Sequence, residues 1–354
     1  QHSACDSALR TTLFDAGLSV RSFPGNLLLE PWQLLKGDGG PYRVFTPFWK
    51  ALQRTLAEST PLPAPERIAG LDDNVGGLKL DELNLLPDSA WDAGLYQAWH
   101  PGETGAHARL HAALDGALLG YADTRDLPAV SGTSRLSPHL HFGELSPRQV
   151  WYAVRAWANG HSGPGYIEAA ESFLRQLAWR EFAQHLLHHF PHTADQPLDA
   201  RFAQVSWNDD VQALRAWQRG RTGIPIVDAG LRELWHTGWM HNRVRMLVAS
   251  LLTKNLRIHW LEGARWFWDT LVDADLGNNT LGWQWVAGCG ADAAPYFRIF
   301  NPVTQGERFD PDGEYVRRWV PELAGLPDKW IHQPFNAPAD VLAAAGLELS
   351  RDYP

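Results

Sequence analysis

The sequence predicts a mainly α-helical protein that is preceded by the end of an α/β domain. Residues 1–60 combine a helix-like segment (7–16), a strand-like run "LSVRSF" (18–23) and a loop broken by glycine and proline, "KGDGGP". Residues 61–100 are rich in Pro, Gly and Asp without periodicity, which is typical of a linker. From residue 101 to 354 the apolar spacing is helical. We therefore expect a partial, Rossmann-like α/β domain, a linker and an all-helical domain over these three ranges.

Length and composition restrict the class of protein. With 354 residues and 45% hydrophobic composition, the chain can bury a large core. Its longest clear apolar run, 246–252, is far shorter than the ~20 residues that cross a bilayer, so we expect no membrane span. Cys5 and Cys289 form no CxxC motif, and no secretory signal is visible, so we expect a cytoplasmic protein with reduced thiols. A net charge of −9 disfavours indiscriminate binding to polyanions but permits a local basic patch.

Two helices of the C-terminal part have clear signals. Ser146 followed by Pro147 places an N-cap and a first-turn proline before "RQVWYAVRAW". The segment 168–190 has apolar residues at Phe173, Leu177 and Phe182, which predicts a long amphipathic helix.

The stretch "DADLGNNTLGWQW" (273–285) concentrates carboxylates, amides and indoles. In a helix, Asp275, Asn279 and Trp283 share one face, while Trp285 points roughly to the opposite side. That face would offer an acceptor, an amide and an indole to a flat, hydrogen-bonding, redox-capable ring. The alternative is that Asp273 and Asp275 cap a helix while the tryptophans pack in the core.

A second stretch, "YADTRDLPAVSGTSRLSPHLHFGELSP" (121–147), places Thr133, Ser134 and Ser137 around a helix start. Hydroxyls and free backbone N–H groups at such a place can bind an anion. The alternative is an ordinary turn with side-chain caps.

A third stretch is "TGWMHNRVRM" (237–246), in which Asn242 and Met246 share a helical face and Arg243 and Arg245 supply two guanidinium groups. The alternative for the two arginines is a solvated face with ordinary ion pairs.

A metal site is a further hypothesis, raised by the histidines of "HLLHHFPH" (185–192). Histidines at i, i+3 and i+4 can chelate, but no acid or cysteine completes this set. We therefore expect a solvated helix end and no metal.

The blocks "GTSRLSPHL", "WREF", "TGWMHNRVRM", "DADLGNNTLGWQW" and "DAAPYFRIFNPVTQGERFD" together resemble the signature blocks of the photolyase/cryptochrome family. "YRVFTPFWKAL" (42–52) matches the family too, so the resemblance covers nearly the entire chain, and it is closest to class I photolyases that repair cyclobutane pyrimidine dimers. It implies a helical FAD-binding domain at 101–354 and the end of an antenna domain at 1–60. By this resemblance, on the order of a hundred residues are missing from the N-terminal domain, and relatives also continue beyond 354. A second, antenna chromophore of the folate or deazaflavin type would bind largely outside this chain.

The resemblance also implies which residues bind the cofactor. The phosphate and ribose side of FAD would be held by Tyr121, Thr133, Ser134, Leu136 and Ser137. The flavin would be lined by Arg180, Asn242, Arg245, Asp273, Asp275 and Asn279, with Arg245 paired to Asp273 and Asn279 facing the flavin N5. An amide at 279 can hydrogen-bond both protonation states of that ring edge.

Electron transfer and substrate binding are implied in the same way. Trp207, Trp260 and Trp283 match a chain of tryptophans that passes electrons from the surface to the photoexcited flavin. The pocket for the dimer would be lined by Gln176, Trp179, Asn242, Met246 and Trp285, and DNA phosphates would be held by Arg125, Arg243 and Arg298.

The implied activity is light-driven repair of cyclobutane pyrimidine dimers, in which reduced, excited FAD donates an electron to a dimer flipped out of UV-damaged DNA. A badly stacked dimer costs a few kcal/mol less to extrude than an intact pair. We expect a monomer with DNA as its partner.

Two alternatives follow from departures within the family. Gln176 stands where class I enzymes usually have a glutamate, and (6-4) photolyases also have a glutamine there. Asn242, in contrast, stands where (6-4) photolyases have a histidine. A cryptochrome-like photoreceptor without repair activity is the other alternative. Asn279 and the combination of Trp179, Trp285 and Met246 favour a photolyase.

Overall fold

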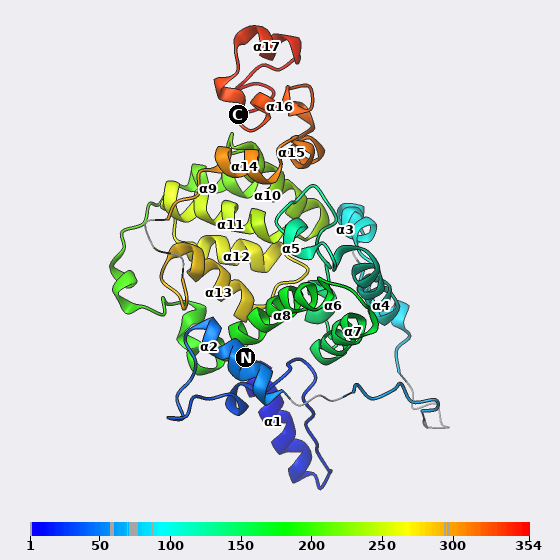
Figure 1. Cartoon of the computed structure of the whole chain (residues 1–354). Coiled ribbons are helices and arrows are strands. Elements are labelled where there is room, and N and C mark those ends of the chain that lie inside the picture. The colour runs from blue at the N-terminus through cyan, green and yellow to red at the C-terminus, as the bar shows by residue number, and fades with distance from the viewer. Residues whose placement is uncertain are drawn as a thin grey trace.

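The fold is a bundle of helices (Figure 1). The computed structural model describes residues 2–56, 60–68, 70, 77–86, 88–293, 295 and 298–354. Across these ranges there is no β-strand, and the one isolated bridge joins Leu349 to Tyr353. None of the described helices is both long and apolar enough to span a bilayer.

The elements follow one another in two groups. The first group is α1 (His2–Asp15), α2 (Phe45–Thr55), α3 (Ala93–Ala98), α4 (Glu103–Ala112), α5 (Tyr121–Thr124), α6 (Ser137–His141), α7 (Pro147–Gly160) and α8 (Tyr166–His189). The second is α9 (Val211–Gln218), α10 (Pro225–Thr237), α11 (Asn242–Ser250), α12 (Trp260–Thr270), α13 (Leu276–Ala287), α14 (Pro302–Phe309), α15 (Glu314–Trp319), α16 (Asp328–Ile331) and α17 (Ala339–Ala344). Short 3-10 turns and two π-helical turns, Ala113–Ala117 and Leu251–Asn255, connect them.

The predicted mainly helical fold and the two clearest helix signals are confirmed. Helix α8 occupies nearly the predicted range. Helix α7 begins at Pro147, and its N-cap Ser146 accepts a hydrogen bond from the backbone N–H of Gln149 at 3.2 Å. Because the cap satisfies a backbone N–H that has no partner within the helix, it fixes where α7 begins.

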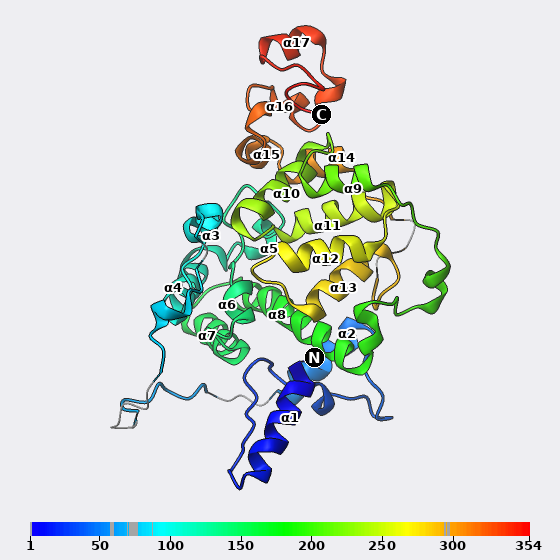
Figure 2. The same ribbon diagram turned by 180° about the vertical axis from the view of Figure 1, so that it is seen from behind.

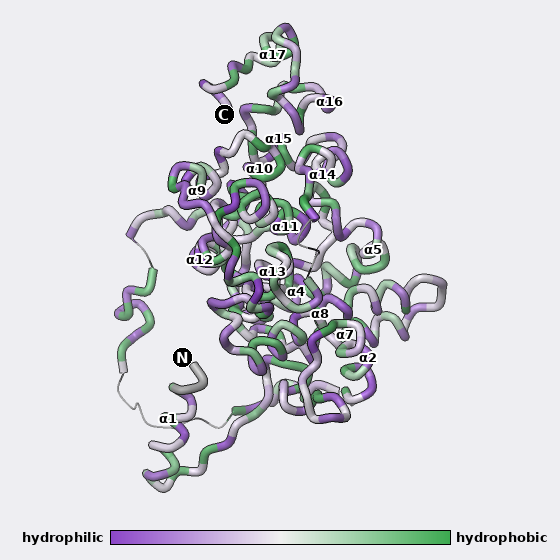
Figure 3. The backbone as a smooth tube through the Cα atoms, turned by 90° about the vertical axis from the view of Figure 1, so that its left-hand side faces the viewer, coloured by the Kyte–Doolittle hydropathy of each residue, from purple (hydrophilic) through white to green (hydrophobic). Residues whose placement is uncertain are grey.

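The prediction of a strand at 18–23 is wrong. The helix predicted at 7–16 is present within α1, but the chain after it is irregular, and Phe23 is 78% exposed. A strand needs a neighbour for its hydrogen bonds, and the described residues offer none. Figure 3 shows α1 standing apart from the bundle.

The linker predicted at 61–100 lies partly outside the described residues, and its last part is not a linker. Helix α3 packs against α10. A Cβ on Gly94 would lie 2.1 Å from the carbonyl oxygen of His236, so only glycine permits this approach. The Trp99 indole then donates a hydrogen bond to the carbonyl of Thr237 at 2.7 Å. The other domain boundaries stay a prediction.

Two hydrophobic clusters form the core. One gathers around α10, α11, α12, α13 and α15, and the other around α2, α6, α7 and α8. Helix α8 packs against α7 on one side and α13 on the other, and Figure 2 shows α6, α8 and α13 in succession. The predicted site residues are distributed over these helices and the turns between them.

Residues 26–42, which we call the N-terminal strap, lie along α8 and are held by its side chains. Arg180 donates to the carbonyl of Asn26 at 2.7 Å. The carboxylate of Glu181 accepts from the backbone N–H of Leu28 at 2.7 Å, and the imidazole of His185 accepts from the backbone N–H of residue 42 at 3.1 Å. The strap therefore buries a carboxylate and an imidazole against the bundle.

This burial corrects one expectation and shifts two pKa values. The helix end at 185–192 is not solvated throughout, because the strap covers His185, which is buried. Burial lowers the pKa of His185 to about 4 and raises the pKa of Glu181 to about 7. The described residues contain no group of three His, Cys, Asp or Glu side chains that could hold a metal.

We expect Glu181 to make stability fall as pH rises. Its folded pKa of about 7 exceeds its ordinary value of 4.5, so the folded state binds the extra proton between these values. The free energy of unfolding should therefore decrease from pH 4.5 to pH 7, by roughly 3 kcal/mol at most. Glu181→Gln removes this contribution. Chemical denaturation of both proteins from pH 5 to 8 should show the free energy of unfolding of the variant rising relative to that of the wild type. A difference that stays constant over this range would contradict the raised pKa of Glu181.

Candidate functional site

The stretch 273–285 forms the start and most of α13. Asp275 is the N-cap, and it accepts from the backbone N–H of Asn278 at 2.8 Å and from the side-chain amide of Gln184 at 2.6 Å. Asn279 donates to the carbonyl of Ala264 at 2.8 Å. Capping, the alternative weighed from the sequence, is therefore real for Asp275. The helical spacing that places residues 275, 279 and 283 on one face is real as well.

An ion pair lies directly before this helix. Arg245 on α11 donates to both carboxylate oxygens of Asp273, at 2.8 and 3.1 Å, and its Nε donates to the carbonyl of Met240 at 2.8 Å. Asp273 is buried. The structure thus contains the pair expected from the sequence, and it fixes α11 against the turn that begins α13. Asn242 is exposed and Met246 half-buried on the same helix, four residues apart.

The turn at 133–137 has an unusual backbone conformation. Arg135 adopts a φ of +52°, which L-residues rarely do. The hydroxyl of Ser134 accepts from the backbone N–H of Leu136 at 3.4 Å, and that of Ser137 accepts from the Trp239 indole at 3.3 Å. Ser134 is half-buried and Ser137 is exposed. Their hydroxyls therefore lie at the turn that leads into α6. Tyr121, also predicted here, is buried.

The three tryptophans of the predicted electron chain differ in burial. Trp207 is half-buried, whereas Trp260 and Trp283 are each 2% exposed. The imidazole of His259 lies between the outer two, 5.1 Å from the Trp207 ring and 5.7 Å from the Trp260 ring. The Trp283 ring lies over Gly263, one turn along α12 from Trp260. Trp207 is therefore the outermost of the three.

Two residues predicted at the flavin and at the dimer pocket contact the N-terminal part of the chain. The Trp179 ring stacks on the Phe45 ring with centroids 3.7 Å apart. Arg180 binds the strap through Asn26. The remaining pocket residues, Gln176, Met246 and Trp285, are half-buried.

The three arginines predicted to hold phosphates are already engaged to different degrees. Arg243 forms an ion pair with Asp126 at 2.7 Å, and Arg125 lies 4.0 Å from the same carboxylate. Arg298 is exposed and lies over the Phe300 ring. The block 292–310 that contains Arg298 lies partly outside the described residues. Ion pairing, the alternative weighed from the sequence for Arg243, is therefore present.

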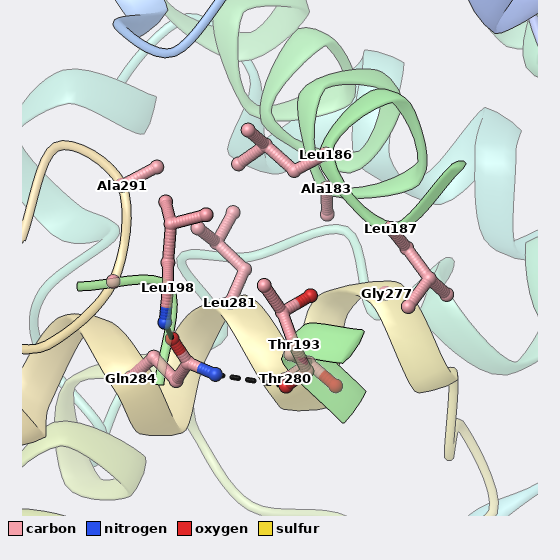
Figure 4. A pocket seen from close by; sticks show the side chains of 11 residues that line it. Ala183, Leu186, Leu187, Thr193, Leu198, Gly277, Thr280, Leu281, Gln284 and Ala291 are labelled. Carbon is pink, nitrogen blue, oxygen red and sulfur yellow. Dashed lines mark hydrogen bonds between the residues drawn. The ribbon is translucent and has the colours of Figure 1, made fainter. Parts of the chain in front are cut away.

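Two hollows in the described structure lie elsewhere. One, between α8 and α13, has a volume of about 20 Å³, room for little more than one water molecule (Figure 4). Gln284 crosses its floor, donating to the carbonyl of Thr193 at 2.8 Å and accepting from the backbone N–H of Leu198 at 3.0 Å. The other, of about 520 Å³, lies among the indoles of Trp235, Trp266 and Trp319. No predicted site residue lines either hollow.

Sequence reasoning missed several polar residues that support the site. Glu233, a buried acid on α10, contacts both Arg135 and the start of α11. His241 caps α11 by accepting from the backbone N–H of Arg243 at 3.2 Å. Acids and amides within otherwise apolar helical runs, as in "IVDAGLREL" and "WQW", are the signal that could have found such residues.

Comparison with known proteins identifies the family. The model for the FAD binding domain of DNA photolyase matches residues 173–354, and the DNA photolyase model matches residues 1–66. The chain belongs to the photolyase/cryptochrome family. It is 51% identical to a deoxyribodipyrimidine photo-lyase of Agrobacterium fabrum, over 99% of this chain and 73% of that protein. It is 41% identical to Cryptochrome-2 of Arabidopsis thaliana, over 98% of this chain but only 58% of that protein.

Solved structures agree and correct the class. A bacterial class III photolyase from Agrobacterium tumefaciens matches with a TM-score of 0.94 and 50% identity, over 99% of this chain and 72% of that one. An archaeal photolyase from Sulfolobus tokodaii with two FAD molecules matches with a TM-score of 0.76 and 31% identity, over 94% and 71%. The prediction of class I is therefore wrong, and the likeness is to class III.

The residues present fit FAD as a cofactor. The ring edges of a flavin need hydrogen-bonding groups, which the Arg245–Asp273 pair and Asn279 supply on adjacent helices. Phosphates need donors at a shaped turn, which the hydroxyls of Ser134 and Ser137 supply. Among the described residues, the buried indole N–H of Trp283 has no hydrogen-bond partner.

We expect Gly263→Ala to destabilise the protein by displacing Trp283. The added Cβ would lie 2.0 Å from Cη2 of the Trp283 indole, so the ring or α12 must move. Overpacking of this kind costs about 1–3 kcal/mol. Thermal unfolding measures the loss.

Gly282→Ala on α13 is the matched control, because its Cβ would meet nothing within 4 Å. It should leave the melting temperature unchanged or raise it, since alanine favours the helix. Equal melting temperatures for the two variants would contradict the close approach of Trp283 to Gly263.

Proposed function

We propose that this chain repairs cyclobutane pyrimidine dimers in DNA with FAD and light. The observation that carries the proposal is the 51% identity over 99% of the chain to a deoxyribodipyrimidine photo-lyase, combined with the pairing of Arg245 to Asp273 beside Asn279. When bound, reduced FAD supplies photoexcited one-electron donation to the dimer. The chain's own residues bind and orient the cofactor and the DNA, and they shield the site from solvent.

We assign the cofactor side to two groups of residues. Tyr121, Thr133, Ser134, Leu136 and Ser137 would hold the phosphates and ribose. Arg180, Asn242, Arg245, Asp273, Asp275 and Asn279 would surround the ring. A neutral amide at 279 holds the N5 edge in either protonation state, whereas an acid there would favour a protonated ring.

On the substrate side, Trp179 and Trp285 would form aromatic walls for the extruded dimer, with Gln176, Asn242 and Met246 beside them. Arg125, Arg243 and Arg298 would contact phosphates, which positions DNA without sequence readout. Because Asp126 already neutralises part of this cluster, binding should be moderate and fall with salt. We further propose a cytoplasmic monomer, in keeping with the free thiols of Cys5 and Cys289.

Two alternative functions deserve direct comparison. A (6-4) photolyase is favoured by Gln176, and a photoreceptor by the 41% identity to Cryptochrome-2. Reduced, FAD-loaded protein should be illuminated with an oligonucleotide carrying one cyclobutane thymine dimer and with another carrying a (6-4) lesion. We expect repair of the first alone. Repair of the second alone would identify a (6-4) photolyase, and photoreduction without repair would identify a photoreceptor.

The tryptophan chain makes a separable prediction. Trp207→Phe should slow photoreduction of oxidised flavin, because it removes the outermost, half-buried indole. Repair by chemically pre-reduced enzyme should stay nearly unchanged, since the chain serves reduction and not repair. Absorbance during illumination measures the first and oligonucleotide repair the second. Trp91→Phe, at an indole that is 72% exposed and outside the predicted chain, is the control. Equal losses in both assays would remove the assignment of Trp207.

A further inference from the structure

Helix α10 carries a carboxylate in a place where a charge is costly. Glu233 is 3% exposed, and Leu231 and Leu234 on the same helix are fully buried. A buried charge is tolerated only when it is paired and hydrogen-bonded. Burial raises the pKa of Glu233, and its partners Tyr315 and Arg135 oppose that rise.

The partners of Glu233 come from three separate elements. The hydroxyl of Tyr315 on α15 donates to Oε2 at 2.6 Å. The Arg135 guanidinium lies 3.4 Å from Oε1, and the backbone N–H of His241 donates to Oε2 at 3.5 Å. One carboxylate therefore joins the turn at 133–137, the start of α11 and α15.

The contact with Arg135 bears on the phosphate side of the proposed cofactor site. Arg135 is the residue with φ of +52° in the turn at 133–137. Its guanidinium lies over the Trp239 ring at 4.4 Å and near the Trp99 ring at 5.8 Å. Trp239 in turn donates to Ser137. Glu233 thus supplies the anion opposite the guanidinium that projects from this turn.

The contact with His241 bears on the flavin side. His241 is the N-cap of α11, the helix that carries Asn242 and Arg245. Arg245 then binds Asp273, immediately before α13. A displacement of His241 would therefore be transmitted to the ion pair that we assign to the flavin ring.

We propose that Glu233 is the positioning residue that holds the phosphate side and the flavin side of the cofactor site in register. This inference rests on the proposed FAD-dependent function. Glu233 does not itself need to touch the cofactor. It acts through Arg135 and His241.

The test compares three variants for FAD affinity and for stability of the apoprotein. Glu233→Gln keeps the shape but removes the charge, and Tyr315→Phe removes one hydroxyl. Glu322→Gln is the matched control, because it breaks the 2.7 Å ion pair with Arg232 on the same helix without touching the site. Titration of apoprotein with FAD, followed by flavin fluorescence, gives Kd. Thermal unfolding of the apoprotein and the visible circular dichroism of the bound flavin are recorded alongside.

We expect Glu233→Gln to weaken FAD binding about tenfold or more, as for a lost hydrogen bond to a charged group, and to alter the circular dichroism of the flavin. Tyr315→Phe should weaken it about threefold, and Glu322→Gln should leave it unchanged. A double variant, Glu233→Gln with Arg135→Met, should bind FAD little worse than either single variant. Each substitution removes the same contact between residues 135 and 233, so their effects on Kd should not add.

Two outcomes would overturn the inference. One is a Glu233→Gln protein whose apoprotein is less stable but whose FAD affinity and flavin spectrum equal those of the wild type. That result would give Glu233 a purely structural role. The other is an unchanged Kd for Tyr315→Phe if Glu233→Gln fails to fold. A wild-type protein that binds no FAD would refute the proposed function, and this role with it.

Discussion

The close crossing of α8 and α13 is the constraint on which the rest of the structure depends. Gly277 favours it, since a Cβ there would lie 3.2 Å from the backbone of Ala183, tighter than most Cβ contacts, and the neighbour would have to shift slightly. The side chain of Gln184 then reaches Asp275 at 2.6 Å and ties the two helices at the start of α13. The crossing brings the two hydrophobic clusters together. It also sets the direction of the helical face that carries Asn279 and Trp283.

A second constraint is electrostatic and lies on α10, which is buried on nearly every side. The helix nevertheless contains two acids, Asp228 and Glu233, at 0% and 3% exposure. Asp228 accepts from Thr222 and from the hydroxyl of Tyr353, which ties the end of the described chain to the core. Breaking a buried pair costs far more than the pair contributes, so these acids specify one arrangement of the segments they join.

The sequence predicted what is periodic or local, and missed what depends on distant partners. Helix α8 and the cap at Ser146 follow from spacing and local hydrogen bonding, and the pair of Arg245 with Asp273 follows from family resemblance. The strand at 18–23 was wrong because strand formation depends on a neighbour that no local pattern supplies. The contacts of Glu233 were missed for the same reason, since its three partners lie eight to 98 residues away. The class within the family came from the comparison with a solved structure and not from the sequence blocks.

The N-terminal strap has a consequence for the substrate side. Trp179 is predicted to form a wall of the dimer pocket, yet its ring is stacked on Phe45 and the next two residues, Arg180 and Glu181, bind the strap. An indole fixed in this way loses little conformational freedom when a base packs against it, so less binding free energy is spent on ordering. Residues before the helical domain therefore help to shape the place where DNA would bind. In the proposed function, the N-terminal part would contribute to the wall of the dimer pocket through Phe45 and the strap.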